Sequence, residues 1–341
     1  MRLRWTPALL FILLCSAQTS FSCSCLLLDK CALPTADAIF LGRVASKQVE
    51  DGGNPDGTVN SVRRSVVQFT VLESFRGVST SNLEVETTEG CCACGIEFIV
   101  GESYVVFANQ FQGKLTTNVC TATRPAASAV ALIPQLRART RGQPTSALFG
   151  LVALQPRPHA HPEPVPIDAL RGVQVKAIGT NSEFTAVTDS YGVFDFSNLP
   201  NDSYVVRPSL SDSLSSKELL QPMRPIIVQN GSSCEYGIWA QWNGRISGRV
   251  IGQAGEPVRG FVALDYVEPK KMNGATQREV GGFTTGDEGR FEFTLLGPDH
   301  YRLSFSPSKG SSIDFNKRVA YSEVITLERG QQISDIVFQV P

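Results

Sequence analysis

Short stretches in which apolar and polar residues alternate recur along the chain, and this pattern indicates β-strands. Five occur in the first part of the sequence, at 38–44, 66–75, 83–87, 104–107 and 115–119. A run rich in Gly and Asp at 51–57 predicts a loop between the first two strands. Residues 127–139 could form a short helix, which Pro134 limits. Five short strands and a helix predict a small closed barrel.

Two later segments, which begin near Phe149 and Gly244, repeat one another. Each contains a Thr, an Asp, a Gly and then F-x-F, at 188–196 and at 285–293. Asp and Gly suit a turn, and F-x-F places two aromatic rings on one face of a strand. This tandem resembles the carboxypeptidase-regulatory-like, transthyretin-like β-sandwich family. The resemblance implies two sandwiches that act as spacers or binding modules.

The first 22 residues have the pattern of a signal peptide. Arg2 and Arg4 precede an apolar run at 8–14, and the small residues Ser20 and Ser22 follow. The run is too short to span a bilayer, which needs about 20 residues, and no later stretch is suited to it. Cleavage would make Cys23 the first mature residue. Lipidation of Cys23 is the alternative, although Ser20 stands where that motif has an aliphatic residue.

The composition favours a packed globular protein without a strongly charged surface. Hydrophobic residues make up 42% and charged residues 18%, with 31 basic and 32 acidic residues and a net charge of −1. This balance argues against a nucleic-acid partner or a polybasic membrane surface. No metalloprotease, nucleophile-elbow or phosphate-loop motif is convincing, so we expect neither an enzyme nor a cofactor. His159 and His161 lie in a proline-rich loop, where solvated residues are expected rather than metal ligands.

The cysteines indicate an oxidising compartment. Nine are present, and eight remain once Cys15 leaves with the signal peptide; an even number in an exported chain implies disulfides. Seven of them lie early in the mature chain and one lies far downstream: Cys23, Cys25, Cys31, Cys91, Cys92, Cys94, Cys120 and Cys234. They could merely staple a small domain. A thioredoxin-type site at 91–94 or a four-cysteine zinc site fits less well.

Several motifs occur in the same order as in a known extracellular module. They are Cys23-Ser24-Cys25, a strand at 37–44, F-R-G at 75–77, Cys94-Gly95, G-x-x-Y at 101–104 and Cys120. This set resembles the netrin-like module and, within it, the tissue inhibitors of metalloproteinases. The resemblance covers roughly residues 23–125 and implies an OB-like five-stranded barrel.

The resemblance also implies a mechanism. In the inhibitor family the α-amine and carbonyl oxygen of the first cysteine chelate the zinc of a protease and displace its catalytic water. By motif position, Cys23 is the chelator of the partner's zinc, Ser24 enters the specificity pocket and Cys25 is the second anchor. The implied disulfides are Cys23–Cys94, Cys25–Cys120, and Cys31 with either Cys91 or Cys92. One of that pair is then left over, and Cys234 is either its partner or free.

We therefore predict a secreted, all-β protein with a signal peptide at 1–22, a netrin-like barrel at 23–141 and β-sandwiches at 146–242 and 244–341. The predicted function is inhibition of zinc metalloendopeptidases. The alternative is a non-inhibitory extracellular or cell-envelope binding or adhesion protein. The short gap from Cys25 to Cys31, which holds three leucines, departs from the inhibitor family, as does the absence of its small C-terminal disulfide domain.

Overall fold

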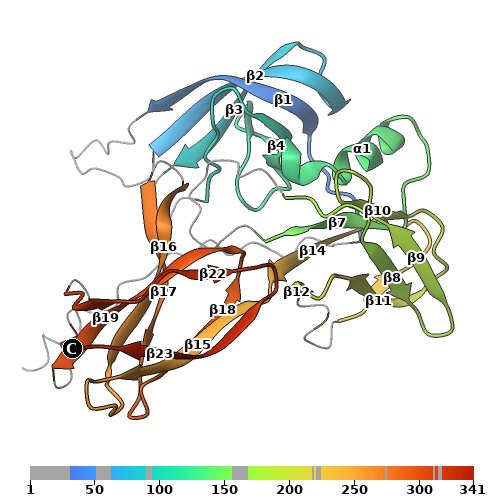
Figure 1. The fold of residues 1–341 in the computed structure, drawn as a ribbon. Coiled ribbons are helices and arrows are strands. Elements are labelled where there is room, and N and C mark those ends of the chain that lie inside the picture. Colours follow the sequence, from blue (N-terminus) through green and yellow to red (C-terminus); the bar gives the residue numbers. More distant parts are fainter. Residues whose placement is uncertain are drawn as a thin grey trace, which may run out of the picture. The chain divides into compact units, whose positions relative to one another are not determined.

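The computed structural model describes residues 31–50, 63–89, 94–155, 168–216, 219, 224–272, 275–309, 312–313 and 317–341. These residues are predominantly β-structure, as predicted (Figure 1). The chain divides into two compact units, residues 1–29 with 34–126 and residues 30–33 with 127–341. No described helix is long and apolar enough to cross a membrane.

The first unit contains a closed barrel of five strands, as predicted; they are β1, β2, β3, β5 and β4, and the short strand β6 pairs with β4 outside the ring. The sheet order is β1-β2-β3-β5-β4-β6, and a further pairing of β1 with β4 closes the ring. The strands are β1 (Ala38–Glu50), β2 (Arg63–Arg76), β3 (Asn82–Glu89), β4 (Ser103–Phe111), β5 (Lys114–Thr116) and β6 (Arg124–Pro125). β1 pairs with both neighbours and has register shifts against β2, which let a long strand bend around the barrel.

Aromatic side chains fill the barrel. Phe40, Phe69, Phe98 and Tyr104 are each at most 2% exposed. Their rings meet in edge-to-face pairs, with centroids 5.5 Å apart for Phe40 and Phe69 and 5.2 Å apart for Phe69 and Phe98. Along each strand, alternate side chains point into the barrel, and these large apolar side chains fill its interior.

The next module is a sandwich of two four-stranded sheets, β10-β7-β14-β12 and β13-β11-β8-β9. Its strands are β7 (Leu148–Leu154), β8 (Gln174–Ile178), β9 (Glu183–Val187), β10 (Val193–Phe196), β11 (Asp202–Ser209), β12 (Leu214–Ser216), β13 (Ile226–Val228) and β14 (Cys234–Trp242). Phe194, Phe196 and Tyr204 lie in its core. β14 runs parallel to β7.

The last module is a second sandwich, with the sheet β18-β15-β23 facing a larger sheet in the order β17-β16-β19-β20. Its strands are β15 (Gly244–Ile251), β16 (Gly260–Met272), β17 (Ala275–Thr284), β18 (Arg290–Leu296), β19 (Asp299–Lys309), β20 (Ser312–Ile313), β21 (Ala320–Tyr321), β22 (Ile325–Leu327) and β23 (Gln332–Gln339). Phe291 and Phe293 lie in its core, as the F-x-F pattern predicts.

The two sandwiches share internal contacts as well as sequence. The hydroxyl of Thr188 accepts a bond from the Val173 amide at 2.9 Å and donates to the Leu170 carbonyl at 2.6 Å. Thr285 does the same with Gly260 and Val258, at 2.9 and 3.0 Å. In both modules a tyrosine hydroxyl bonds back four residues, Tyr204 to Pro200 and Tyr301 to Gly297. In each module, the hydroxyl of the repeated threonine therefore links the turn before the F-x-F strand to the backbone at the start of an earlier strand, β8 in the first sandwich and β16 in the second.

The α-helix α1 (Leu132–Thr140) is preceded by the 3-10 turn η2 (Ala126–Ala129). The helix was expected to start at residue 127 and to belong to the first module. Its contacts instead lie in the second unit, where the Gln135 amide nitrogen bonds to Ser146 at 3.1 Å and to Asp195 at 3.2 Å. Pro134 is tolerated because it lies in the first turn, where backbone amides have no helical acceptor.

Candidate functional site

The predicted inhibitory residues Cys23, Ser24 and Cys25 lie outside the described residues, as do Cys91 and Cys92. The structure describes one cysteine of each of the two implied disulfides, the one that belongs to the barrel. Cys94 and Cys120 are both disulfide-bonded. The Val119 amide donates to the Cys94 carbonyl at 2.8 Å, which holds the chain at Cys120 beside Cys94. The pairings Cys23–Cys94 and Cys25–Cys120 stay predictions, because their other halves are not described.

The predicted bond from Cys31 to Cys91 or Cys92 is wrong, because Cys31 is bonded to Cys234, 203 residues away in the sequence. The backbone explains this pairing. The Ser233 amide donates to the Cys31 carbonyl at 3.0 Å, and Arg139 of α1 donates to the Leu33 carbonyl at 3.3 Å. Residues 31–33 therefore run beside the start of β14. Cys234 is neither free nor the partner of a leftover cysteine in the first module.

Of the three histidines, His300 is the one that lies among the described residues. His159 and His161 lie outside the described residues. His300, on β19, has its Nδ1 atom 2.9 Å from the Thr326 hydroxyl on the neighbouring strand β22.

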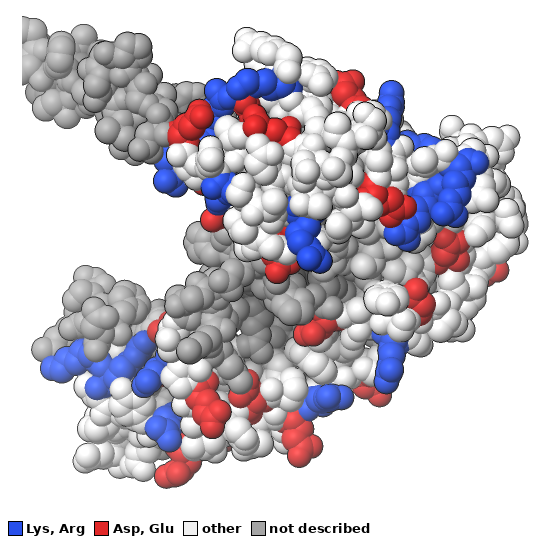
Figure 2. Space-filling view, turned by 90° about the horizontal axis from the view of Figure 1, so that it is seen from above, with Lys and Arg blue, Asp and Glu red and all other residues white. Residues whose placement is uncertain are grey.

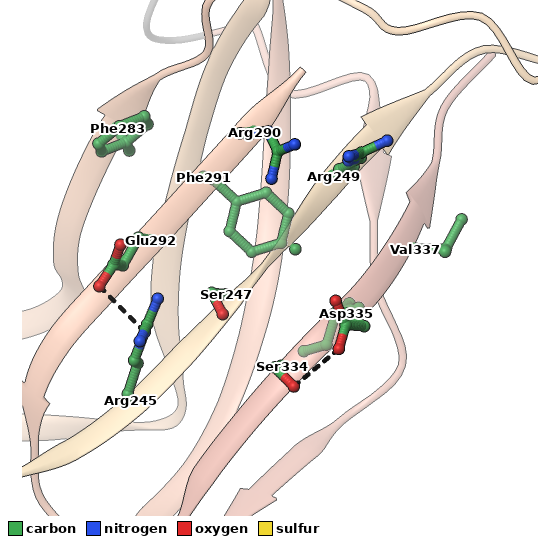
Figure 3. A pocket seen from close by; sticks show the side chains of 12 residues that line it. Arg245, Ser247, Arg249, Phe283, Arg290, Phe291, Glu292, Ser334, Asp335 and Val337 are labelled. Atoms are coloured by element: carbon green, nitrogen blue, oxygen red, sulfur yellow. Dashed lines mark hydrogen bonds and ion pairs between the residues drawn. The ribbon is translucent and has the colours of Figure 1, made fainter. Parts of the chain in front are cut away.

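A pocket of about 480 Å³ opens on the outer face of the sheet β18-β15-β23 in the last module (Figure 3). Its volume falls within the range usual for small-ligand sites. Its polar lining comes from alternate positions of β15 and β18 and from consecutive residues of β23. The lining residues are Arg245, Ser247, Gly248, Arg249, Phe283, Arg290, Phe291, Glu292, Ser334, Asp335, Ile336 and Val337.

Two arginines stand directly opposite each other in this pocket, since Arg249 of β15 is the register partner of Arg290 of β18. Like charges in directly opposed strand positions are destabilising. Glu288 offsets part of this repulsion: its hydrogen bond from Arg290, at 2.6 Å, and the nearby charges of Arg290 and Arg249 lower the pKa of its carboxyl. The third arginine, Arg245, forms an ion pair with Glu292 at 3.0 Å.

The β23 side of the pocket is made by a β-bulge. Ile246 pairs with Ile333 and Gly248 with Ile336, so β23 has one more residue than β15 between these pairs. Within the bulge, Asp335 adopts a positive φ of 59°, which is uncommon for a residue other than glycine, and its carboxylate accepts a bond from Ser334 at 2.9 Å. Gly248 permits the close approach, because a Cβ there would lie 2.1 Å from the Ile336 carbonyl oxygen.

The first sandwich shows what the same face is like when it is covered. Phe194 pairs with Gly150 there just as Phe291 pairs with Gly248, so Phe149 and Leu151 occupy the positions of Ser247 and Arg249. Phe149 is fully buried and Leu151 nearly so. Gln135 of α1 bonds to Asp195 on this face, and Figure 1 draws α1 beside β7 and β10. In the last module these positions are polar, and the face is open.

In the sequence, the signal for this pocket lies in the polar positions between the repeated core residues. R-x-S-x-R at 245–249 and R-x-E at 290–292 put charges on the faces opposite the core residues of two strands. Elsewhere charges are mixed. On the side of the molecule seen in Figure 2, the basic and acidic side chains of the described residues are interspersed. The pocket itself is lined by three arginines and two carboxylates, Glu292 and Asp335.

Comparison with known proteins places the chain in no family. Its sequence matches no protein-family model and no curated protein. Among solved structures it is distantly similar to the minor pilin GBS52 of Streptococcus agalactiae, with 15% identity, a TM-score of 0.22 and coverage of 57% of this chain and 95% of the pilin. The Bacillus anthracis TIE protein has 12% identity and a TM-score of 0.32, with coverage of 89% of this chain and 52% of that protein. The major pilin RrgB of Streptococcus pneumoniae has 8% identity and a TM-score of 0.21, with coverage of 91% and 68%.

Proposed function

We propose that the chain is an exported, non-catalytic binding protein of the extracellular space or cell envelope, and that it attaches to its ligand through the pocket on β18-β15-β23. The observation that carries this proposal is the open face itself. Arg249 and Arg290 oppose each other there, whereas the equivalent β7 positions of the first sandwich are the buried apolar residues Phe149 and Leu151. If this face only had to be solvated, two opposed arginines would be unfavourable, because an arginine opposite a carboxylate is more stable than an arginine opposite another arginine.

Disulfide bonding supports the proposed location. Cys31, Cys94, Cys120 and Cys234 are all disulfide-bonded. Such bonds form and persist in oxidising compartments and are rare in the cytosol. This agrees with the signal peptide expected at residues 1–22, which lies outside the described residues.

The proposal predicts that blocking the pocket abolishes attachment. Ser247→Glu puts a carboxylate between Arg245 and Arg249 on the outer face of β15, where it would pair with the arginines and occupy the ligand's place. Retention of the labelled protein on immobilised extracellular glycans and matrix proteins should fall by about tenfold or more, since charge-assisted bonds contribute roughly 1.5–3 kcal/mol.

Gln339→Glu is the matched control, because it adds the same charge at an exposed position of β23 that does not line the pocket. It should leave retention unchanged. If Ser247→Glu, folded as judged by circular dichroism, were retained as well as the wild type on every surface that holds the wild type, the pocket would not be the attachment site.

A second candidate, inhibition of zinc metalloproteases by the first module, is favoured by the closed barrel and by the disulfide bonding of Cys94 and Cys120. One alanine added before Cys23 should abolish such inhibition, because it converts the chelating amine into an amide and inserts a side chain at the metal. Ser24→Gly should only change which proteases are inhibited. The measurement is inhibition of a panel of zinc endopeptidases; inhibition that survives the extension would exclude the chelation mechanism.

A further inference from the structure

The pocket on the last module also indicates the class of ligand. Building on the proposed function, we propose that this ligand is an acidic saccharide, a sugar chain bearing carboxylates, with one carboxylate held between Arg249 and Arg290. Four features of the described residues lead to this assignment: the opposed arginines, the acidic and hydroxyl groups beside them, the exposed apolar rim and the bulged edge strand.

The opposed arginines favour a planar anion as the ligand, because a guanidinium group is itself planar. A carboxylate accepts two parallel bonds from one guanidinium, and two guanidiniums on neighbouring strands can share it through its remaining lone pairs. Figure 3 shows the side chains of Arg249 and Arg290 on adjacent strands at the same end of the pocket. An anion bound between them would relieve the part of their repulsion that Glu288, paired with Arg290 at 2.6 Å, does not offset. Among the described residues, no ion pair or hydrogen bond is found for Arg249, so its guanidinium is available.

The rest of the lining limits how much negative charge the ligand carries. Glu292 and Asp335 are exposed carboxylates in the same pocket, with Ser247 and Ser334 beside them. A densely charged ligand such as a polyphosphate would be repelled by these carboxylates. A ligand in which a carboxylate alternates with hydroxyl groups would instead donate hydrogen bonds to them. Uronic acids and related sugars have this pattern.

Apolar groups border the polar ones. Phe283 of β17 is 39% exposed and Val337 of β23 is 65% exposed, although both are large hydrophobic residues. The carbon–hydrogen face of a sugar ring can pack on such surfaces, and removing their apolar area from water favours binding.

The edge of the sheet disfavours an extended peptide as the ligand. Peptides commonly bind sheets by adding a strand at an open edge. β23 is an edge strand, but its bulge and the positive φ of Asp335 interrupt the regular row of backbone groups that an added strand would need. A ligand that lies over the face of the sheet, rather than along its edge, fits this arrangement.

The test is a calorimetric titration of the full chain with three probes: tetragalacturonate, its fully methyl-esterified form, and an aspartate-rich peptide of the same net charge. Tetragalacturonate should bind, the ester should bind at least about tenfold more weakly because its carboxylates are neutral, and the peptide should bind no better than the ester. Arg249→Gln and Arg290→Gln should each weaken tetragalacturonate binding by about tenfold or more.

Arg259→Gln is the matched control, because Arg259 is an exposed arginine of the same module, paired with Asp287, that does not line the pocket. It should bind tetragalacturonate as the wild type does. Equal affinity for the acid and its ester, or undiminished binding by Arg249→Gln and Arg290→Gln, would overturn the inference. So would tighter binding of the peptide.

The two proposals fail in different ways. If no saccharide binds but Ser247→Glu still loses retention on extracellular surfaces, the ligand class is wrong and the attachment site stands. If Ser247→Glu keeps full retention, the proposed function itself fails, and with it the ground for the saccharide.

Discussion

Replacing both Cys31 and Cys234 with alanine is expected to lower the free energy of unfolding of the first sandwich by about 5 kcal/mol. A disulfide stabilises mainly by restricting the unfolded chain, and the restriction grows with the length of the loop that it closes. Here the closed loop spans 203 positions of the sequence, and Cys234 also lies in the core of the first sandwich. Urea unfolding followed by tryptophan fluorescence would measure the loss, because Trp239 and Trp242 lie on β14.

The same titration in the presence of a reductant provides the control. Wild type and variant should then unfold at similar urea concentrations, because neither has the bond. A gap that persists after reduction would mean that packing around Cys234, and not the cross-link, accounts for the difference.

Phe293→Ala should destabilise the last module by about 3–5 kcal/mol, the usual cost of removing a buried phenylalanine ring. Phe293 is 8% exposed and belongs to the same core as Phe291, whose ring centroid is 6.0 Å away. The expected readout is an earlier thermal transition for this module in calorimetry. Thr294→Ala, at the exposed neighbouring position of β18, should change stability by less than about 0.5 kcal/mol. Equal effects of the two changes would place Phe293 outside the core.

Local sequence patterns predict the elements that depend on residues close together in the sequence, such as the barrel strands. The barrel strands were found because alternation reports which side of a strand is buried. Four of the five strands are longer than expected, whereas β5 ends at Thr116 rather than at residue 119. β1, for example, continues from the expected end at residue 44 to Glu50, with exposed polar residues still paired to β2. Backbone hydrogen bonds to β2 keep this end of β1 extended although its side chains are exposed. A pattern of side-chain hydrophobicity cannot detect such backbone pairing.

What the sequence did not reveal depends on segments that are far apart in the chain. The pairing of Cys31 with Cys234 follows from residues 31–33 lying beside β14, and cysteine spacing contains no information on that. The parallel pairing of β7 with β14 is also long-range. The repeated Thr188 and Thr285 were recognised as part of a pattern, but their role became visible only once their hydroxyl partners were known.

The candidate pocket lies between these cases. Its charged positions can be read as the outer faces of two predicted strands, but their significance needs a reference for comparison. The first sandwich supplies that reference, since Phe149 and Leu151 stand where the last module has Ser247 and Arg249. A repeat therefore provides an internal control: positions that share a core but differ on the outer face are those at which the two copies have diverged.

The long-range disulfide also determines how the chain would respond to mechanical tension. A pull transmitted from residues before Cys31 to residues after Cys234 passes through the sulfur–sulfur bond and leaves residues 32–233 unloaded. At about 3.5 Å per extended residue, roughly 700 Å of chain is thereby prevented from unravelling. The barrel and most of the first sandwich would stay folded under a load that β14 and the last module alone must bear.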